Sequence, residues 1–152
     1  MRRRSVADMN CSVAQTLEVV GDAWTLLIVR DALFGATRFD QFVESLGVSR
    51  NTLTSRLTTL VEHGVLERTK YQERPDRFEY HLTDKGRALH PVIVAMLGWG
   101  DEWAGFDEPP ITLVDRESGD DLDPIYVDRN SGTPIAEIAV GRRFNDGPGA
   151  QA

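Results

Sequence analysis

Apolar side chains recur at helical spacing in the first part of the chain. Residues 12–20 carry them every three or four positions, and residues 22–34 repeat the pattern after Gly21. We therefore predict two helices that separate at this glycine. The second is apolar around most of its circumference, at Trp24, Leu26, Leu27, Ile28 and Val29. Such a helix is expected to run through the centre of the core and to end at Gly35.

Two shorter helices are predicted next. Residues 39–46 form an amphipathic segment closed by Gly47, and Ser49 stands at the N-cap position of a helix that extends to residue 62. His63-Gly64 follows as the stop signal. Two short helices joined by a tight turn that contains glycine are typical of a helix-turn-helix.

Strand patterns follow this pair of helices. Residues 65–71 and 78–83 are predicted to be strands, and the polar connection 72–77, which contains proline, makes them a β-hairpin with a charged tip. Thr83 then caps a further helix, which Pro91 is expected to kink or weaken. The apolar stripe of that helix consists of Leu89, Val92, Ile93, Met96, Trp99 and Trp103.

The pattern changes after residue 107. Glycine, proline and aspartate become frequent between short apolar runs at residues 111–114, 125–127 and 135–140, so residues 107–144 are predicted to be a small β-rich extension. We expect residues 145–152 to be a disordered tail and residues 1–9, which include Arg2 to Arg4, to be a basic flexible arm.

The extension contains an internal repeat. Asp-Arg-Glu-Ser-Gly at residues 115–119 returns 13 residues later as Asp-Arg-Asn-Ser-Gly at 128–132, which indicates two equivalent hairpin turns. Their spacing is that of paired zinc-ribbon knuckles, but the ligand positions hold only the oxygens of Asp115, Ser118, Asp128 and Ser131. Because zinc prefers thiolate or imidazole, we predict a metal-free relic of such a module or an independent pair of hairpins; a calcium-like oxygen site is the less favoured alternative.

The charge of the chain is unevenly distributed. The formal net charge is -7, but residues 1–90 contain 13 basic and 12 acidic residues, whereas residues 91–152 contain 4 and 12. The acidity therefore belongs to the extension and the helix before it. Residues 45–61 contain no acid, only Arg50 and Arg56, so this segment is able to face a polyanion.

Other classes of protein find little support. No apolar run is long enough to cross a bilayer, and the amino terminus lacks the apolar segment of a signal peptide. The single cysteine, Cys11, fits a reducing cytoplasm. Neither a phosphate-binding loop nor an activated nucleophile is present, and His63, His81 and His90 do not cluster. We expect a cytoplasmic protein that is not an enzyme and has no cofactor, no metal and no membrane contact.

The order of the predicted elements is that of a winged helix-turn-helix domain, at residues 10–106. The fold class is mainly α with a small β wing, plus the extension. Asn51, Thr52 and Ser55 lie where such helices meet base edges in the major groove, and Arg50 and Arg56 are better placed for phosphates. The wing at 72–77 is expected to meet the flanking backbone. The full candidate DNA-binding set is Ser49, Arg50, Asn51, Thr52, Ser55, Arg56, Arg74 and Arg77.

Several short motifs resemble those of one known family. They are Gly-Asp-Ala-Trp-Thr-Leu-Leu-Ile at 21–28, Arg38-Phe39, the segment 48–57, His-Gly-Val-Leu at 63–66, Tyr-His-Leu-Thr-Asp-Lys-Gly at 80–86, and Trp99-Gly100. In this order and spacing they resemble the HxlR family of bacterial transcriptional regulators, relatives of MarR, over residues 10–104.

The resemblance implies a homodimer that binds a pseudo-palindromic DNA operator, with repression as the default. It assigns the stripe from Leu89 to Trp103 to dimerisation, together with part of the 12–20 helix; an ordinary intrachain core produces the same stripe. An unidentified small-molecule effector is compatible with this family. The rival hypothesis is a winged-helix module for protein contacts. The acidic extension is expected to lie away from DNA, beside the dimer helices, and to help shape an effector or partner site.

Cys11 has two interpretations. Many members of the family carry a cysteine just before the first helix, and in some it senses oxidants, which makes Cys11 a candidate redox sensor. The proline that commonly follows two residues later is replaced here by Val13. The favoured interpretation is a buried, inert cysteine.

Overall fold

The computed structural model describes residues 6–143; Arg2 to Arg4 and the predicted tail at 145–152 lie outside this range. The chain divides into two compact units after Ile93, and each is described by itself. Within the described range no single helix is long and apolar enough to cross a membrane, and the helices Ser12–Val20 and Ala23–Leu33 reach that length only together, across an 80° bend.

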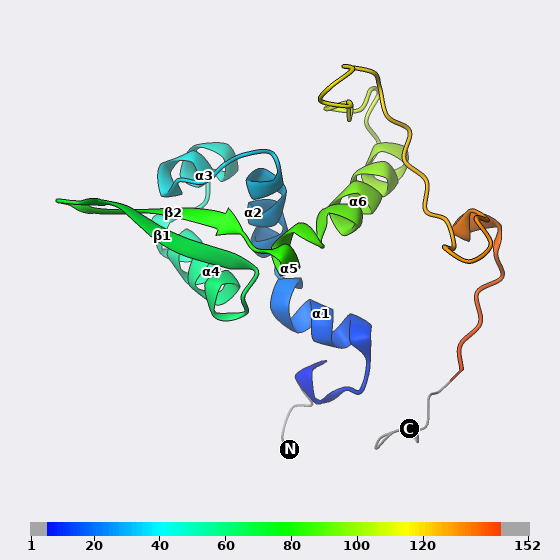
Figure 1. Cartoon of the computed structure of the whole chain (residues 1–152), viewed down its shortest axis with the longest axis horizontal. Helices are drawn as coiled ribbons and strands as arrows, with labels where there is room; N and C mark the ends of the chain where they lie inside the picture. The colour runs from blue at the N-terminus through cyan, green and yellow to red at the C-terminus, as the bar shows by residue number, and fades with distance from the viewer. Residues whose placement is uncertain (1–5, 144–152) are drawn as a thin grey trace. The chain divides into compact units, whose positions relative to one another are not determined.

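The first unit begins with four helices (Figure 1). They are α1 (Ser12–Val20), α2 (Ala23–Leu33), α3 (Phe39–Leu46) and α4 (Arg50–Glu62). The predicted break at Gly21 is confirmed, because Asp22 caps α2 by accepting hydrogen bonds from the backbone N–H groups of Trp24 and Thr25 at 3.0 and 3.3 Å. Before α1, a short 3-10 helix, η1 (Val6–Asp8), contains the first described residues.

Helix α2 runs through the core as predicted. Ile28 and Val29 are fully buried, and the helix packs against α3, α4 and β2. The buried face also includes polar Thr25, whereas Trp24 is 36% exposed. Trp24, one turn before Ile28, therefore lies at the edge of the buried face and not within it.

The wing is a twisted antiparallel hairpin that extends beyond the helices (Figure 1). Strands β1 (Leu66–Glu73) and β2 (Asp76–Leu82) are longer than predicted, so that only Arg74 and Pro75 remain between them. The register runs from Leu66 opposite Leu82 to Glu73 opposite Asp76, with an irregularity at Tyr71. Sequence reasoning missed a short third segment beside β2: Tyr80 N–H donates to Thr37 O at 2.7 Å, and Arg38 forms an isolated bridge with Glu79.

The helix predicted after Thr83 is two helices. Thr83 caps α5 (Asp84–Arg87) by accepting from Gly86 N–H at 3.1 Å, and α6 (His90–Trp103) follows. Pro91 lies in the first turn of α6, where its missing N–H costs no helical hydrogen bond. The expected weak point at this proline is thus the start of a new helix. Helix α6 begins in the first unit and continues into the second.

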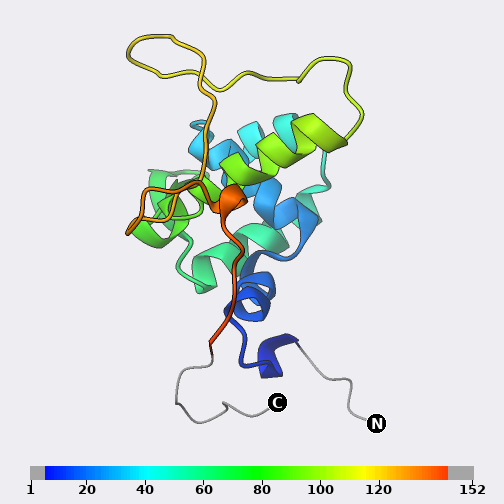
Figure 2. The same ribbon diagram turned by 90° about the vertical axis from the view of Figure 1, so that its right-hand side faces the viewer.

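The extension contains loops where strands were expected (Figures 1 and 2). Its regular structure in the described residues is the 3-10 helix η2 (Ile135–Glu137), and two isolated bridges pair Val114 with Asp121 and Val127 with Pro134. The apolar runs therefore do not build a sheet. Each bridge instead closes one copy of the internal repeat.

The two copies form equivalent turns, as predicted. Asp115 Oδ1 accepts from the N–H groups of Glu117 and Ser118 at 2.8 and 2.9 Å, and Asp128 Oδ2 accepts from Ser131 N–H and Oγ, both at 2.8 Å. These hydrogen bonds lower the pKa of both aspartates. In the part of the chain that the structure describes, no three His, Cys, Asp or Glu side chains form a group that could hold a metal ion.

Candidate nucleic-acid interface

The predicted helix-turn-helix is formed by α3 and α4. Gly47 ends α3 in the left-handed conformation at φ 61°, and Ser49 caps α4 by accepting from Thr52 N–H at 3.2 Å. One face of α4 is buried, at Leu53, Leu57 and Leu60. The opposite face is therefore available to a partner, which is the orientation that insertion into a DNA groove requires.

Three threonines of α4 bond to their own helix. The hydroxyls of Thr54, Thr58 and Thr59 donate to the carbonyl oxygens of Arg50, Thr54 and Ser55, one turn earlier, at 2.8 to 3.1 Å. This is the usual way in which a hydroxyl residue satisfies itself within a helix. Hydrogen bonds within α4 therefore account for part of the accumulation of hydroxyl residues on this helix.

Two predicted phosphate-contacting arginines have acidic partners. Arg50 lies 2.9 Å from Asp40 of α3, and Arg56 Nε lies 2.9 Å from Oδ1 of Asp22, the residue that caps α2. The second contact is an ion pair by distance, although the N–H direction does not satisfy hydrogen-bond geometry. Neither acid belongs to the acid-free segment 45–61, so only the fold shows that the segment's charge is partly neutralised.

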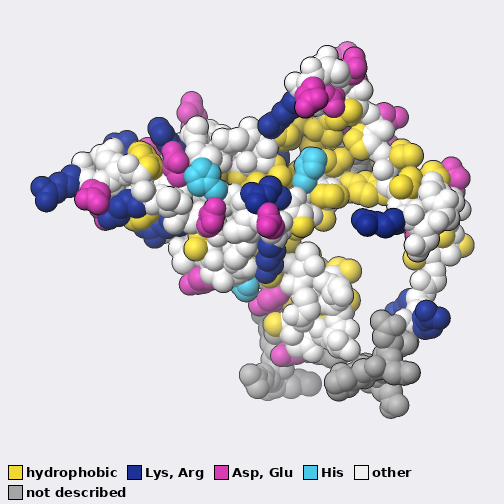
Figure 3. All heavy atoms as spheres, in the orientation of Figure 1, with side chains coloured by type: hydrophobic (Ala, Val, Ile, Leu, Met, Phe, Trp, Pro, Cys, Tyr) yellow, Lys and Arg dark blue, Asp and Glu magenta, His cyan; other side chains and the backbone are white. Residues whose placement is uncertain are grey.

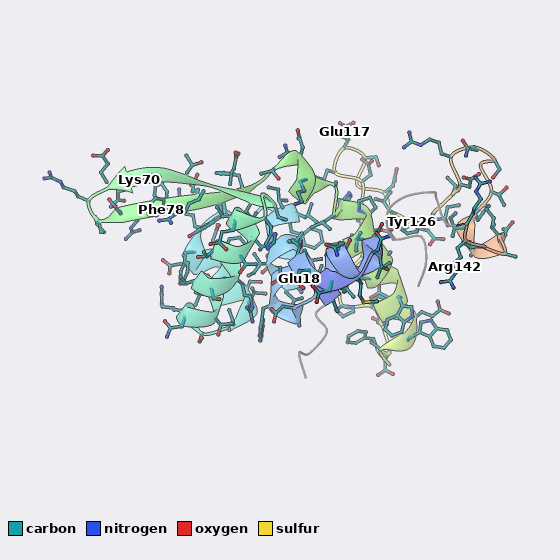
Figure 4. The ribbon with its side chains drawn as sticks, turned by 90° about the horizontal axis from the view of Figure 1, so that it is seen from below. Glu18, Lys70, Phe78, Glu117, Tyr126 and Arg142 are labelled. Atoms are coloured by element: carbon teal, nitrogen blue, oxygen red, sulfur yellow. The ribbon has the colours of Figure 1, made fainter. Side chains whose placement is uncertain are left out.

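The wing tip carries the other two predicted arginines. Arg74 and Arg77 are exposed, and among the described residues no ion pair involves either of them. Lysine and arginine side chains gather at this end of the hairpin, with acids beside them (Figure 3). Farther along the wing, Arg68 and Lys70 lie over the ring of Phe78, at 3.4 and 5.8 Å from its centroid (Figure 4). These two exposed basic residues were not singled out from the sequence.

Arg38 connects the α2–α3 segment to the wing. Its Nε donates to Glu79 Oε1 at 3.1 Å, its guanidinium lies 4.7 Å from the centroid of the Tyr71 ring, and Glu79 Oε2 is 3.3 Å from His81 Nε2. The hydrogen bond from Arg38 lowers the pKa of Glu79 below its ordinary value of 4.5, and His81 adds to the shift. The Arg38-Phe39 motif therefore positions the wing through its arginine.

We expect this link to make stability depend on pH in the acidic range. A carboxylate whose pKa is lowered by folding contributes stability above its ordinary pKa, and this is lost as the pH falls through the lowered, folded-state pKa. Wild type should melt at a higher temperature than Glu79→Gln at pH 7, and the difference should diminish as the pH falls below the ordinary value of 4.5 and through the lowered pKa. Glu73→Gln, at the exposed end of β1, is the control. A difference independent of pH would contradict the assignment.

Apolar side chains are exposed along α6 and α1. Of the six predicted dimerisation residues, Ile93 is buried in the first unit and Leu89 is half-buried. The exposed members of α6 are Val92, Met96, Trp99 and Trp103, and we call these four residues the apolar stripe. Val13 and Leu17 of α1 are exposed as well. Hydrophobic side chains gather over α6 in Figure 3.

Cys11 is exposed, which corrects the expectation that this cysteine is buried. It occupies the N-cap position of α1 in an extended conformation and makes no side-chain capping hydrogen bond. The sequence pattern was misleading because a residue just before an amphipathic helix lies outside its buried face. The thiol is therefore accessible to solvent.

The fold and these surfaces define a transcriptional regulator with a helix-turn-helix domain, and comparison with known proteins shows which group of regulators it represents. The sequence model described as "HxlR-like helix-turn-helix" matches residues 19–108, more than half of the chain. The protein belongs to this HxlR-like family.

Individual relatives support the assignment. The chain is 44% identical to the uncharacterized HTH-type transcriptional regulator Rv3095 of Mycobacterium tuberculosis, over 93% of this chain and 89% of that protein. The crystal structure of PA1607, described as a candidate transcription factor, has 43% identity and a TM-score of 0.79, and covers 92% of this chain and all of its own. The reduced form of the redox regulator HypR has 30% identity and a TM-score of 0.59, over 62% of this chain and 95% of HypR. The first two matches extend beyond the family region into the extension.

Proposed function

We propose that the protein is a transcriptional repressor that binds pseudo-palindromic operator DNA as a homodimer. Helix α4 enters the major groove, and the wing tip contacts the flanking backbone. The observation that carries this proposal is the exposed face of α4, which bears no acid before Glu62 at its end and is held by the buried Leu53, Leu57 and Leu60 on its other side. The Arg74 and Arg77 side chains extend the same binding surface.

The apolar stripe supports the homodimer. Trp99 and Trp103 are 68% and 65% exposed, and a large aromatic side chain buries roughly 150–250 Å² when it is covered. A standard interface buries about 800 Å² on each partner. The two tryptophans thus supply a substantial part of that area. A two-fold pair of stripes would present two copies of α4, which is what a pseudo-palindromic site requires.

The acidic extension is proposed to stay away from DNA. Residues 91–152 have 12 acids and 4 bases, so they are repelled by phosphates. In this arrangement residues 10–106 bind DNA and dimerise, and residues 107–144 form a separate module that helps shape a site for a small-molecule effector or a partner. Repression follows from occlusion of the promoter by the bound dimer.

A fluorescence titration with the protein's own promoter DNA tests the proposal. We expect affinity to fall steeply with salt, and Arg74→Ala and Arg77→Ala each to reduce the slope of log affinity against log salt by about one per arginine removed, or about two per dimer. Arg129→Ala, in the extension, is the matched control and should leave the slope unchanged. Absence of binding at low salt would favour the rival hypothesis, a winged-helix module for protein contacts.

Regulation through Cys11 is a second candidate function. The exposure of the Cys11 thiol favours it, and HypR, one of the structural neighbours, is described as a redox regulator. In this hypothesis, oxidation of the thiol at the start of α1 alters the dimer and thereby DNA binding. The same titration is repeated after wild type and Cys11→Ser have each been treated with an oxidant. A change in DNA affinity in wild type alone separates regulation through Cys11 from control by an effector.

A further inference from the structure

The exposed face of α4 is less uniform than its composition suggests. It carries five polar residues, which we call the recognition face: Asn51, Thr52, Ser55, Thr58 and Thr59. A side chain reads a base edge only with hydrogen-bonding groups that the protein itself does not use. The internal hydrogen bonds of α4 therefore decide which of the five are able to do so.

Three of the five are engaged. Thr58 and Thr59 give their hydroxyl hydrogens to carbonyl oxygens one turn earlier. Thr52 Oγ1 lies 2.8 Å from Ser49 Oγ, which also accepts Thr52 N–H, so that these two residues together close the amino-terminal end of the helix. The threonines thus shape and stabilise α4, and each keeps little capacity for specific donation.

Asn51 and Ser55 are different. Both side chains are exposed, and in the described part of the chain neither makes a hydrogen bond through its side chain. They are four residues apart, on the same side of the helix and about 6 Å apart along its axis. Successive bases along one strand are about 3.4 Å apart. Two such side chains therefore reach base pairs that are adjacent or separated by one.

The neighbouring arginines strengthen this distinction. Arg50 is paired with Asp40 and Arg56 with Asp22, each at 2.9 Å. An arginine that reads guanine needs its guanidinium free for both acceptors of that base. In this chain both guanidinium groups lie beside a carboxylate, Arg50 at Asp40 and Arg56 through its Nε at Asp22, whereas the carboxamide of Asn51 has no such partner at the start of α4.

We propose that Asn51 reads an adenine in each operator half-site and that Ser55 contacts a base pair next to it or one step further. The inference rests on the proposed function and deepens it. The asparagine carboxamide presents one acceptor and one donor side by side, and the major-groove edge of adenine presents the complementary donor N6 and acceptor N7. Asn51 is then a specificity-determining residue, and the threonines are positioning residues.

Selection from a random double-stranded DNA library by the full-length protein tests this inference without knowledge of the operator. Wild type should enrich sites with an invariant adenine at one position of each half-site. Asn51→Ala should lose the preference at that position alone and bind the wild-type site more weakly by roughly 10- to 100-fold for each of the two half-sites, the range expected for one bidentate base contact. Asn51→Arg should change the preferred base to guanine. Thr58→Ala, with a self-bonded hydroxyl, is the control and should retain every preference.

The outcomes distinguish failure of the base assignment to Asn51 from failure of the proposed DNA binding. If Asn51→Ala enriches the same adenine as wild type, or if Thr58→Ala loses it, the base assignment is overturned while DNA binding stands. If wild type binds DNA at low salt but enriches no sequence, the assignment also fails. If wild type does not bind DNA at all, the proposed function fails and the inference falls with it. Circular dichroism melting of each variant confirms that the exposed substitutions leave the fold intact.

Discussion

Gly86→Ala is expected to lower the free energy of unfolding by about 3 kcal/mol, the upper part of the range for forcing an added carbon into a packed site. A Cβ at this position would lie 2.2 Å from the carbonyl oxygen of Val65 and 2.8 Å from Leu82 Cδ2. The first of these atoms belongs to the backbone at the start of the wing. It is unable to move without disturbing the hairpin.

Hydrogen bonds explain why the Val65 carbonyl oxygen lies so close to Gly86. Thr83 Oγ1 donates to the carbonyl oxygens of Gly64 and Val65 at 2.6 and 3.2 Å, and Lys85 Nζ donates to His63 O at 2.7 Å. These bonds draw α5 against the segment between α4 and β1. The family-like motif Thr-Asp-Lys-Gly therefore joins the end of α4, the wing and the start of α5 at one place.

Urea unfolding of the full-length protein measures the effect. Gly141→Ala is the matched control, because a Cβ there meets nothing within 4 Å and the backbone is outside the positive-φ region. We expect the control to stay within about 0.5 kcal/mol of wild type, as is usual for surface substitutions. If Gly86→Ala and Gly141→Ala unfold at the same urea midpoint, the backbone around Gly86 accommodates the added Cβ and the prediction is wrong.

Trp99→Ala is expected to raise the dissociation constant of the proposed homodimer by roughly 10³- to 10⁶-fold. Large aromatic residues at the centre of an interface typically cost 2–4 kcal/mol when truncated, and Trp99, which is 68% exposed in the single chain, has the greatest exposure within the apolar stripe of α6. The substitution occurs in both copies, so its effect is counted twice at a two-fold interface.

Sedimentation over a dilution series measures this dissociation. Phe34→Ala is the control, since Phe34 is also an exposed aromatic residue, at 50%, but follows α2 and lies outside the stripe. We expect Phe34→Ala to dimerise like wild type. Wild type that stays monomeric at all concentrations, or an equal loss in both variants, would contradict the role assigned to α6.

Features that depend on local sequence could be predicted, because the interacting groups lie within one helical turn. Asp22, Ser49 and Thr83 each cap a helix by accepting a backbone N–H two or three residues later. Periodicity likewise placed Ile28 and Leu57 in the core. The fold class follows from these signals, and the same signals place α4 at the candidate interface.

Contacts between distant segments could not be predicted in this way. The partner of Arg56 is Asp22, on another helix, and that of Arg38 is Glu79, on the wing. Neither pair leaves a trace in the local pattern, yet both change the charge of the candidate site. The missed third segment at Thr37 and Arg38 has the same explanation, because two residues are too few to show alternation.

The extension shows that short apolar runs alone do not predict strands. Its apolar runs resemble strands, but a strand is stable only when other strands and an apolar cover accompany it. Ile125 and Val140, in two of these runs, are 67% and 73% exposed. The turns were predicted correctly because an Asp side chain bonding backbone N–H groups two or three residues ahead is again a local interaction.

These twin turns contain no thiol. Where a zinc knuckle would use thiolates, Asp115 and Asp128 hold the backbone with oxygens that neither oxidants nor chelators attack. The chain has one cysteine, and it lies at the start of α1. An electrophile that reaches the protein thus has a single thiol to modify, and that thiol lies outside the acidic extension.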